Sequence, residues 1–289
     1  MVRAMEPDPP PGAPEPSTAN TAETVLLERD GPVAVITINR PEARNAVDWP
    51  TAVALYEAFR QIEADDSADV AILTGAAGTF CSGADLKAIA TDRGNRMEPQ
   101  PPDQMVGSIG PMGPTRLLLS TPVIAAVEGY AVAGGLELAI WCDLRVAARD
   151  SAFGVFCRRW GVPLVDGGTV RLPRLIGHSR AMDLILTGRE VAGEEALAIG
   201  LANRLTEPGD SLGVAVELGH QLAALPQRCL RSDRRSSYEQ WGLDLGHALG
   251  NELGHGMATV RSGETVSGAA RFAAGAGRHG QTADSDPVS

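Results

Sequence analysis

The chain has 289 residues, of which 44% are hydrophobic, and a formal net charge of −11 at pH 7. This length can bury a sizeable core, either as one large domain or as a domain with an appendage. The negative charge provides no electrostatic attraction to nucleic acid or to an anionic membrane, so we expect neither as a partner.

The four cysteines and five histidines form no pattern typical of a metal site or a disulfide framework. The cysteines are widely spaced without a Cys-x-x-Cys pair, and no His-Glu-x-x-His sequence occurs. The N-terminus lacks the apolar stretch of a signal peptide. The apolar run from Leu117 to Cys142 contains Glu128 and Glu137, and a charged group costs ~3 kcal/mol at a bilayer centre. We therefore expect no metal ion and a cytoplasmic globular protein.

The N-terminal part begins with a predicted flexible tail, because residues 1–22 are rich in proline and nearly devoid of large apolar side chains. The segment Val25–Ile38 is typical of a β-hairpin that turns at Asp30-Gly31. Helical spacing of apolar residues then predicts a helix over Trp49–Ala64.

The middle of the chain alternates short apolar strands with helices. Buried strands are expected at Val70–Gly75, Pro122–Val127 and Leu144–Ala148, and helices at Ser179–Leu186 and Glu194–Ile199. This alternation predicts an α/β core.

Residues 90–116 are polar and rich in Gly, Pro and Met. A loop of this length inside a compact domain is more often a functional lid than a neutral connector, and disorder is the alternative.

The remainder of the chain is predicted to be helical, with helices at Leu212–Leu225, Ser236–Val260 and Gly263–Ala274. We expect the helices after Pro226 to pack on the core or on a neighbouring subunit. The predicted parts of the chain are a disordered tail (1–22), an α/β core (23–225), a C-terminal helical region (226–279) and a second disordered tail (280–289).

One stretch combines two chemical groups at the start of a predicted helix. Gly134 and Gly135 lie where the strand ends, and the unpaired N–H groups of a helix N-terminus favour negative charge. Glu137 follows within one turn, and helical side chains lean toward the N-terminus, so its carboxylate reaches the same place. The alternative interpretation is a buried helix in which Glu137 lies in the first turn because its charge is favourable at the positive end of the helix dipole.

Several motifs, in this order and spacing, resemble the crotonase superfamily, the enoyl-CoA hydratase/isomerase proteins. The resemblance covers about Val25 to His279. It rests on Asn39-Arg-Pro41, Arg44-Asn-Ala46, Phe80-Cys-Ser-Gly-Ala-Asp-Leu86, Pro122-Val-Ile-Ala-Ala-Val-Glu-Gly-Tyr-Ala131, Gly134-Gly-Leu-Glu-Leu138, Cys142-Asp143, Gly167-Gly-Thr169 and Leu172-Pro-Arg-Leu-Ile-Gly177.

The resemblance implies an α/β fold, a crotonase-like spiral of stacked ββα turns with a C-terminal helical part that builds trimers, often paired into hexamers. Members bind acyl-CoA thioesters, with coenzyme A as part of the substrate and no other cofactor. Two backbone N–H groups stabilise the enolate, and by position these are those of Ala84 and Gly134. Prearranged donors of this kind are worth ~3 to 4 kcal/mol each.

The resemblance also implies where coenzyme A binds. Arg44 occupies a place where members often carry a basic residue facing the CoA phosphates. The alternative interpretation is that Arg44 is a solvated surface residue. We expect Trp160 to help shape the acyl pocket. The segment after Cys81 is similar to the one that holds adenine and pantetheine, and its candidate contacts are Ser82, Asp85, Leu86 and Lys87.

The chain departs from the family pattern at Cys157. Family hydratases use two glutamates; Glu137 matches the first, and Cys157 stands in the place of the second. A thiol is a weaker hydrogen-bond acceptor with an ordinary pKa of about 8.5. Arg158 and Arg159 would lower that pKa if they lay near it, and a small buried apolar role is the alternative.

Asp166 is the acid that remains close in sequence. Some isomerases and dehalogenases of the family carry a catalytic Asp in this region, displaced by one residue from this one. A catalytic or substrate-shaping role and a helix-cap role before Gly167 both stay open.

These residues predict an acyl-CoA enzyme of the hydratase/isomerase type, with Glu137 as the acid/base. Within that class, a double-bond isomerase or another enolate reaction without hydration is the alternative, because the second glutamate is absent. A family member that binds CoA without catalysis is a further alternative.

Overall fold

The computed structural model describes residues 23–91 and 93–277. The tails predicted at 1–22 and 280–289 therefore lie outside the described residues. The division into a core and a C-terminal region at residue 226 stays a prediction.

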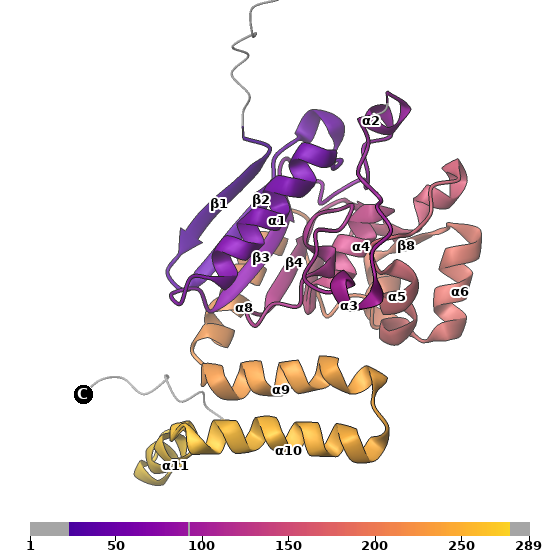
Figure 1. The fold of residues 1–289 in the computed structure, drawn as a ribbon. Coiled ribbons are helices and arrows are strands. Elements are labelled where there is room, and N and C mark those ends of the chain that lie inside the picture. The colour runs from indigo at the N-terminus through magenta and orange to yellow at the C-terminus, as the bar shows by residue number, and fades with distance from the viewer. Residues whose placement is uncertain (1–22, 92, 278–289) are drawn as a thin grey trace, which may run out of the picture.

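A six-stranded sheet forms the centre of the core (Figure 1). Its strands, in spatial order, are β1 (Val25–Asp30), β2 (Val33–Ile38), β3 (Val70–Gly75), β4 (Val123–Val127), β6 (Leu144–Ala148) and β9 (Arg204–Thr206). The pair β1–β2 is antiparallel, which confirms the predicted hairpin, and the other neighbours are parallel. Parallel strands require crossover connections, and helices supply them.

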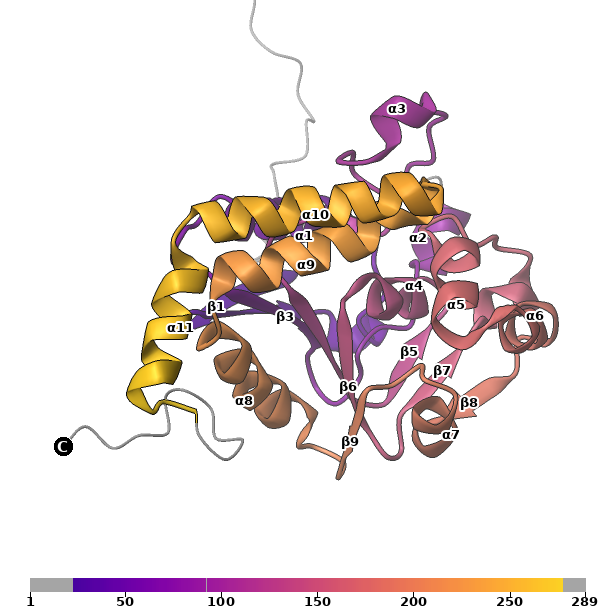
Figure 2. The ribbon, with the colours of Figure 1, turned by 90° about the horizontal axis from the view of Figure 1, so that it is seen from below.

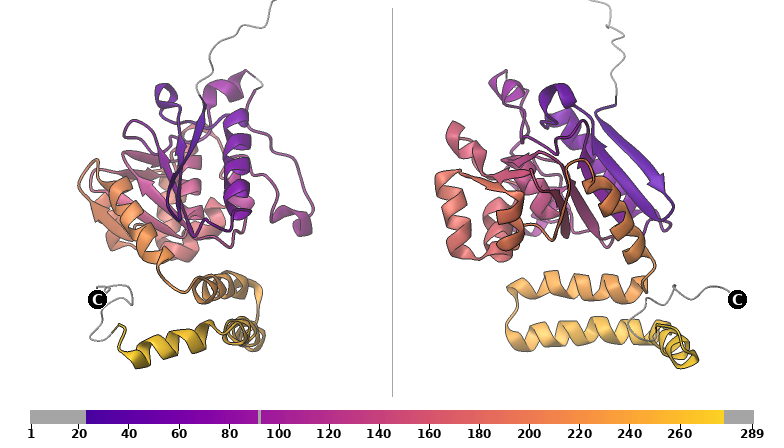
Figure 3. Two further views of the ribbon diagram at one scale, coloured as in Figure 1. Left: turned by 90° about the vertical axis from the view of Figure 1, so that its left-hand side faces the viewer. Right: turned by 180° about the vertical axis from the view of Figure 1, so that it is seen from behind.

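The two faces of this sheet are covered by different helices (Figure 3). Helix α8 (Ser211–Ala223) packs on one face, where Leu218 joins a cluster with Val33 and Ile72. Helix α1 (Trp49–Glu63) packs on the other face, where its Phe59 meets Trp141 edge-on at 4.8 Å between ring centroids. Burying each large apolar side chain stabilises the fold by ~1.5–3 kcal/mol.

A smaller sheet lies beside the main one and consists of β5 (Tyr130–Val132), β7 (Ala152–Gly154) and β8 (Glu190–Ala192). Strands β4 and β5 are separated by Glu128 and Gly129, and Gly129 has a φ of +52°. The chain bends there because glycine adopts this conformation without steric cost. The sequence did not predict this sheet, since a strand of three residues is too short to show an alternating pattern.

Short and medium helices fill the space around the smaller sheet. They are α2 (Leu86–Ala90), α3 (Pro102–Met105), α4 (Gly134–Trp141), α5 (Gly168–Ile176), α6 (His178–Thr187) and α7 (Gly193–Ala198). Helices α6 and α7 confirm two predicted helices. Helices α2 and α3 are separated by irregular chain within the predicted lid segment, and a 3₁₀ turn at Pro114–Arg116 ends that segment.

The C-terminal helices are α9 (Gln227–Glu239), α10 (Leu245–Arg261) and α11 (Glu264–Ala274). The prediction of one helix over Ser236–Val260 is wrong. A 3₁₀ turn at Gln240–Gly242 follows α9, and Asp244 then begins α10 by accepting a hydrogen bond from the N–H of His247. The apolar spacing runs through this break and conceals it, while Gly242 and the capping Asp244 were the local signals.

Helices α9 and α10 run side by side across one side of the core (Figure 2). Two ion pairs tie α9 to the core: Arg234 with Asp143 at 2.8 Å and Arg231 with Asp69 at 3.2 Å. Within the described ranges, no helix combines the length and the apolar character that crossing a bilayer requires.

Candidate active site

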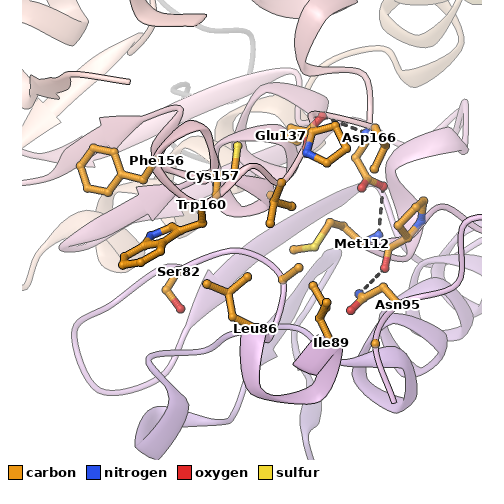
Figure 4. Close-up of a pocket in the computed structure, with 18 of the residues that line it drawn as sticks. Ser82, Leu86, Ile89, Asn95, Met112, Glu137, Phe156, Cys157, Trp160 and Asp166 are labelled. Atoms are coloured by element: carbon orange, nitrogen blue, oxygen red, sulfur yellow. Dashed lines mark hydrogen bonds between the residues drawn. The ribbon is translucent and has the colours of Figure 1, made fainter. Parts of the chain in front are cut away.

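A cavity of about 720 Å³ opens between the N-terminus of α4, helix α2, the lid segment and the chain around residues 156–166. In Figure 4, Ser82, Leu86 and Ile89 lie across this cavity from Phe156, Cys157 and Trp160. Glu137 and Asp166 lie together at one end. The cavity thus brings together residues from all four of these parts of the chain.

Ala84 and Gly134 both line this cavity, and each carries a backbone N–H group. Among the described residues, neither N–H donates a hydrogen bond to the protein. Gly83 has a φ of +101°, and a Cβ added to it would lie 3.1 Å from the nitrogen of Gly134. A glycine at 83 therefore lets the two donors approach each other.

The direction of the Gly134 N–H is set by the residue before it. Ala133 is the N-cap of α4 and has φ +55° and ψ −124°, a conformation that residues with a side chain rarely adopt. Its own N–H donates to the carbonyl of Gly154, which holds it in place. Backbone strain of this kind costs ~1–3 kcal/mol and persists where the surrounding structure enforces it.

The carboxyl group of Glu137 is buried at the end of the cavity, and the side chain is 2% exposed. Its Oε1 accepts hydrogen bonds from the N–H groups of Asp166 and Gly168, both at 2.8 Å. A Cβ at Gly168 would lie 2.9 Å from that oxygen, so only glycine leaves room for this contact. The backbone after Val165 therefore fixes one oxygen of Glu137.

The environment of Glu137 raises its pKa to about 7. Burial is the main cause and the charge of Asp166 is the second, while the N–H groups of Gly168, Asp166 and Val165 oppose them. A carboxyl with such a pKa both releases and accepts a proton readily at neutral pH, which suits general acid/base work.

The carboxylate of Asp166 holds the lid segment against the cavity. Its Oδ1 accepts hydrogen bonds from the N–H of Met112 at 2.9 Å and from the hydroxyl of Thr115. The side chain of Arg171 joins the carbonyls of Asp166 and Thr115. Burial raises the pKa of Asp166, and the Thr115 and Met112 hydrogen bonds oppose that shift. Its side chain makes no capping bond to α5, whose N-cap is Gly167.

Cys157 lines the cavity from a 3₁₀ turn and is 6% exposed. Burial raises the pKa of its thiol, and the nearby charge of Glu137 raises it further. Arg158 acts in the opposite direction but does not prevail. The group is therefore a neutral thiol at neutral pH, in contrast to the thiolate that adjacent arginines would have favoured.

The predicted CoA contacts divide into two sets. Arg44, Ser82, Leu86 and Trp160 line the cavity, and Trp160 is 71% exposed. Asp85 and Lys87 are not among the lining residues. The carboxylate of Asp85 caps α2 by accepting from the N–H groups of Lys87 and Ala88, and it pairs with Arg40 at 3.0 Å.

The lid supplies lining residues that sequence reasoning did not name individually. These are Gly94, Asn95, Arg96, Met97, Pro111 and Met112. Met112 is 1% exposed, and a Cβ added to Gly134 would lie 2.7 Å from its sulfur, so the lid packs directly on the start of α4. The Gly-, Pro- and Met-rich composition indicated a lid, but it contained no signal for which side chains point inward.

Comparisons with known proteins give a consistent result. The model of the family described as "Enoyl-CoA hydratase/isomerase" matches residues 28–240. The chain is 34% identical to the enoyl-CoA hydratase EchA19 of Mycobacterium tuberculosis, over 89% of this chain and 96% of that protein. It is 37% identical to the carnitinyl-CoA dehydratase of Salmonella arizonae, over 87% and 96%. The crystal structure of the enoyl-CoA hydratase EchA1 from Mycobacterium marinum superposes with a TM-score of 0.80 and 38% identity, over 87% of this chain and 96% of that one.

Proposed function

The chain belongs to the enoyl-CoA hydratase/isomerase family, and from this premise we propose that it adds water to a 2-enoyl-CoA thioester and catalyses the reverse elimination. It has the expected crotonase-like α/β fold with C-terminal helices. It is an acyl-CoA enzyme of the hydratase/isomerase type.

The observation that carries the proposal is the position of Glu137. A buried carboxyl with a pKa of about 7 lies in the same cavity as the free N–H groups of Ala84 and Gly134. Such a carboxyl transfers protons at neutral pH, and two N–H donors in the same cavity stabilise negative charge on a thioester oxygen.

We assign the steps of hydration as follows. The ionised carboxylate of Glu137 takes a proton from water while the water oxygen bonds to C3 of the enoyl group. The electron pair of the double bond moves to the thioester oxygen, where the N–H groups of Ala84 and Gly134 stabilise the enolate. The protonated Glu137 then delivers its proton to C2, which restores the thioester and the carboxylate.

The neighbours of Glu137 support this single-carboxyl scheme. Cys157, as a neutral thiol, does not serve as a base. Asp166 acts as a positioning residue, since its Oδ1 binds the lid and its N–H holds Glu137. We propose that Arg44, Ser82, Leu86 and Trp160 contact coenzyme A or the start of the acyl chain; a CoA role for Asp85 and Lys87 stays a prediction.

We also propose that coenzyme A, as part of the substrate, is all the reaction requires, and that the chain assembles as a homotrimer or hexamer through its C-terminal helices. Support for assembly comes from α10, where Leu245, Leu249 and Leu253 recur every four residues and are 56–75% exposed. Leucines at this spacing form one helix face.

The test is incubation of the purified protein in heavy water with crotonyl-CoA and with a 3-enoyl-CoA, with products identified by mass. We expect addition of water to crotonyl-CoA, with one deuterium at C2. If crotonyl-CoA at a saturating concentration gains no mass in the presence of the enzyme, the proposed hydration is overturned.

A double-bond isomerase is the second candidate, and the presence of Cys157 at the second acid position favours it. Migration of a double bond needs one base that moves a proton from C2 to C4, and Glu137 alone suffices for it. Conversion of the 3-enoyl-CoA into the 2-enoyl-CoA without hydration of either would identify this reaction.

A further inference from the structure

A second cavity of about 560 Å³ adjoins the first, and Val165 and Asp166 line both. Its wall comes from the lid end, the carboxyl end of α4, helix α5 and the end of α9. Much of this wall is apolar and includes Leu117, Leu119, Ile140, Trp141, Val170 and Leu175. The size and the apolar wall suit a methylene chain.

The net charge of the residues that line this cavity is opposite in sign to the net charge of the protein. Although the chain carries a formal net charge of −11, the cavity is lined by Arg116, Arg171, Arg174 and Arg234 against the two carboxylates Asp143 and Asp166. A positive recess in an acidic protein concentrates anions locally.

Both carboxylates of the wall are already occupied. Asp143 accepts from Arg234 at 2.8 Å, from the hydroxyl of Tyr238 at 2.7 Å and from the N–H of Val123 at 2.7 Å. Asp166 accepts from the lid. Neither carboxylate therefore forms an ion pair with the remaining arginines of the wall.

Two of the four arginines are held by a carboxylate or by two carbonyls, and the other two make fewer polar contacts. Arg234 is paired with Asp143, and Arg171 bonds to two carbonyls. The guanidinium of Arg174 stacks on Trp241, 4.6 Å from the ring centroid, and makes no hydrogen bond or ion pair with another described residue. Arg116 makes one long hydrogen bond, 3.4 Å, to the carbonyl of Ile109.

Resting on the proposed function, we propose that the acyl chain of the substrate passes Val165 and Asp166 into this second cavity and ends there in a carboxylate bound by Arg174 and Arg116. The substrate class is a medium-chain 2-enoyl-CoA with a carboxylate at its far end. A guanidinium binds a carboxylate through two parallel hydrogen bonds, and the Trp241 ring holds that of Arg174 in orientation.

The test compares two saturated ligands of equal length, the CoA thioester of decanoic acid and the mono-CoA thioester of decanedioic acid, by titration calorimetry. Because a hydrogen bond to a charged group contributes ~1.5–3 kcal/mol, the diacid ligand should bind wild-type protein about tenfold or more tightly than the monoacid. Arg174→Met and Arg116→Met should each reduce that preference and leave the affinity for the monoacid ligand within about threefold. Arg180→Met, an exposed arginine on α6 that lines neither cavity, is the matched control.

Hydration of the corresponding 2-enoyl thioesters is measured in parallel. Equal or weaker binding of the diacid, or a preference that survives both substitutions, would overturn the inference even if both thioesters are hydrated. Tighter diacid binding that depends on Arg174 supports it even if neither thioester is hydrated, in which case the proposed reaction alone has failed.

Discussion

Two regions that line the first cavity, the start of α4 and the 3₁₀ turn at Phe156–Trp160, differ in how they are prepared for proton transfer. On the side of α4, backbone donors fix one oxygen of Glu137, and burial with a neighbouring charge raises its pKa to about 7. In the 3₁₀ turn, burial and the charge of Glu137 likewise raise the pKa of the Cys157 thiol. Burial keeps a carboxyl neutral up to physiological pH, but it removes a thiol from any titration near neutrality.

The comparison shows that an upward pKa shift brings a carboxyl into the working pH range and moves a thiol further out of it. The ordinary pKa of a carboxyl lies below neutrality, so an upward shift brings it to the working pH, while that of a thiol already lies above it. We therefore propose that acid/base chemistry is concentrated in Glu137, and four substitutions test this asymmetry.

The largest effect is expected for Glu137→Gln. The amide keeps an oxygen for the two backbone donors but carries no transferable proton, so kcat for hydration should fall by ~10³. Binding of an acyl-CoA, measured by calorimetry, should stay within about threefold, because the loss concerns proton transfer and leaves uniform binding intact. Glu57→Gln, at an exposed position on α1, is the control. If Glu137→Gln keeps more than a tenth of the wild-type hydration rate, the acid/base role of Glu137 is refuted.

A smaller loss is expected for Gly83→Ala. The new Cβ would lie 2.8 Å from that of Ala133 and 3.1 Å from the nitrogen of Gly134, at a φ of +101°, so the two N–H donors must separate. Displacing one oxyanion donor should lower kcat by ~10². Gly78→Ala also has a positive φ, +71°, but no neighbouring atom within 4 Å, and it should keep near-wild-type activity. Equal loss in both variants would show that backbone strain alone is responsible.

The third substitution, Asp166→Asn, tests the pH dependence. In the wild type, kcat/KM for hydration should rise with pH through about 7, as Glu137 loses its proton and becomes the base. Removing the negative charge of Asp166 makes ionisation of Glu137 easier, which lowers its pKa, so the rise should move to lower pH. Asparagine still accepts the hydrogen bonds of Met112 and Thr115.

Tyr56→Phe serves as the control for this shift, because it removes a hydrogen bond that holds the lid segment, from the Tyr56 hydroxyl to the carbonyl of Gly107, and leaves Asp166 and its partners unchanged. It should alter KM without moving the rise to lower pH. An unchanged profile in Asp166→Asn would mean that the charge of Asp166 does not act on Glu137.

The smallest effect is expected for Cys157→Ala. A neutral thiol that takes no part in proton transfer leaves kcat within about threefold when it is removed, in contrast to the ~10²–10⁴ that a proton-transferring group contributes. A loss of two orders of magnitude, with unchanged melting temperature, would instead identify the thiol as the missing second acid.

Much of the architecture could be predicted from the sequence. The hairpin, the helix α1 and the buried strands β3, β4 and β6 have clear periodicities, and the spacing of Gly134 and Glu137 indicated the site. The small sheet and the break between α9 and α10 could not be found this way, because strands of three residues and a short turn barely disturb an apolar pattern.

The site was predicted less completely, because its decisive contacts join distant residues. The bond from Met112 to Asp166 spans 54 positions, and the bond from Gly168 to Glu137 spans 31. No local pattern encodes such a pair. The raised pKa of Glu137 depends on burial and on Asp166 together, so it became visible only with the tertiary structure.

The attachment of the lid to Asp166 determines an order of events in time. Asp166 accepts hydrogen bonds from Met112 and Thr115 through its carboxylate and donates one to Glu137 through its N–H. Withdrawal of the lid would therefore admit water to the carboxyl of Glu137 and screen the charge of Asp166. Glu137 would then return toward the pKa of an ordinary solvated carboxyl. We expect the protein to be chemically idle while open and to become reactive on closure, which spares a waiting thioester from unproductive attack.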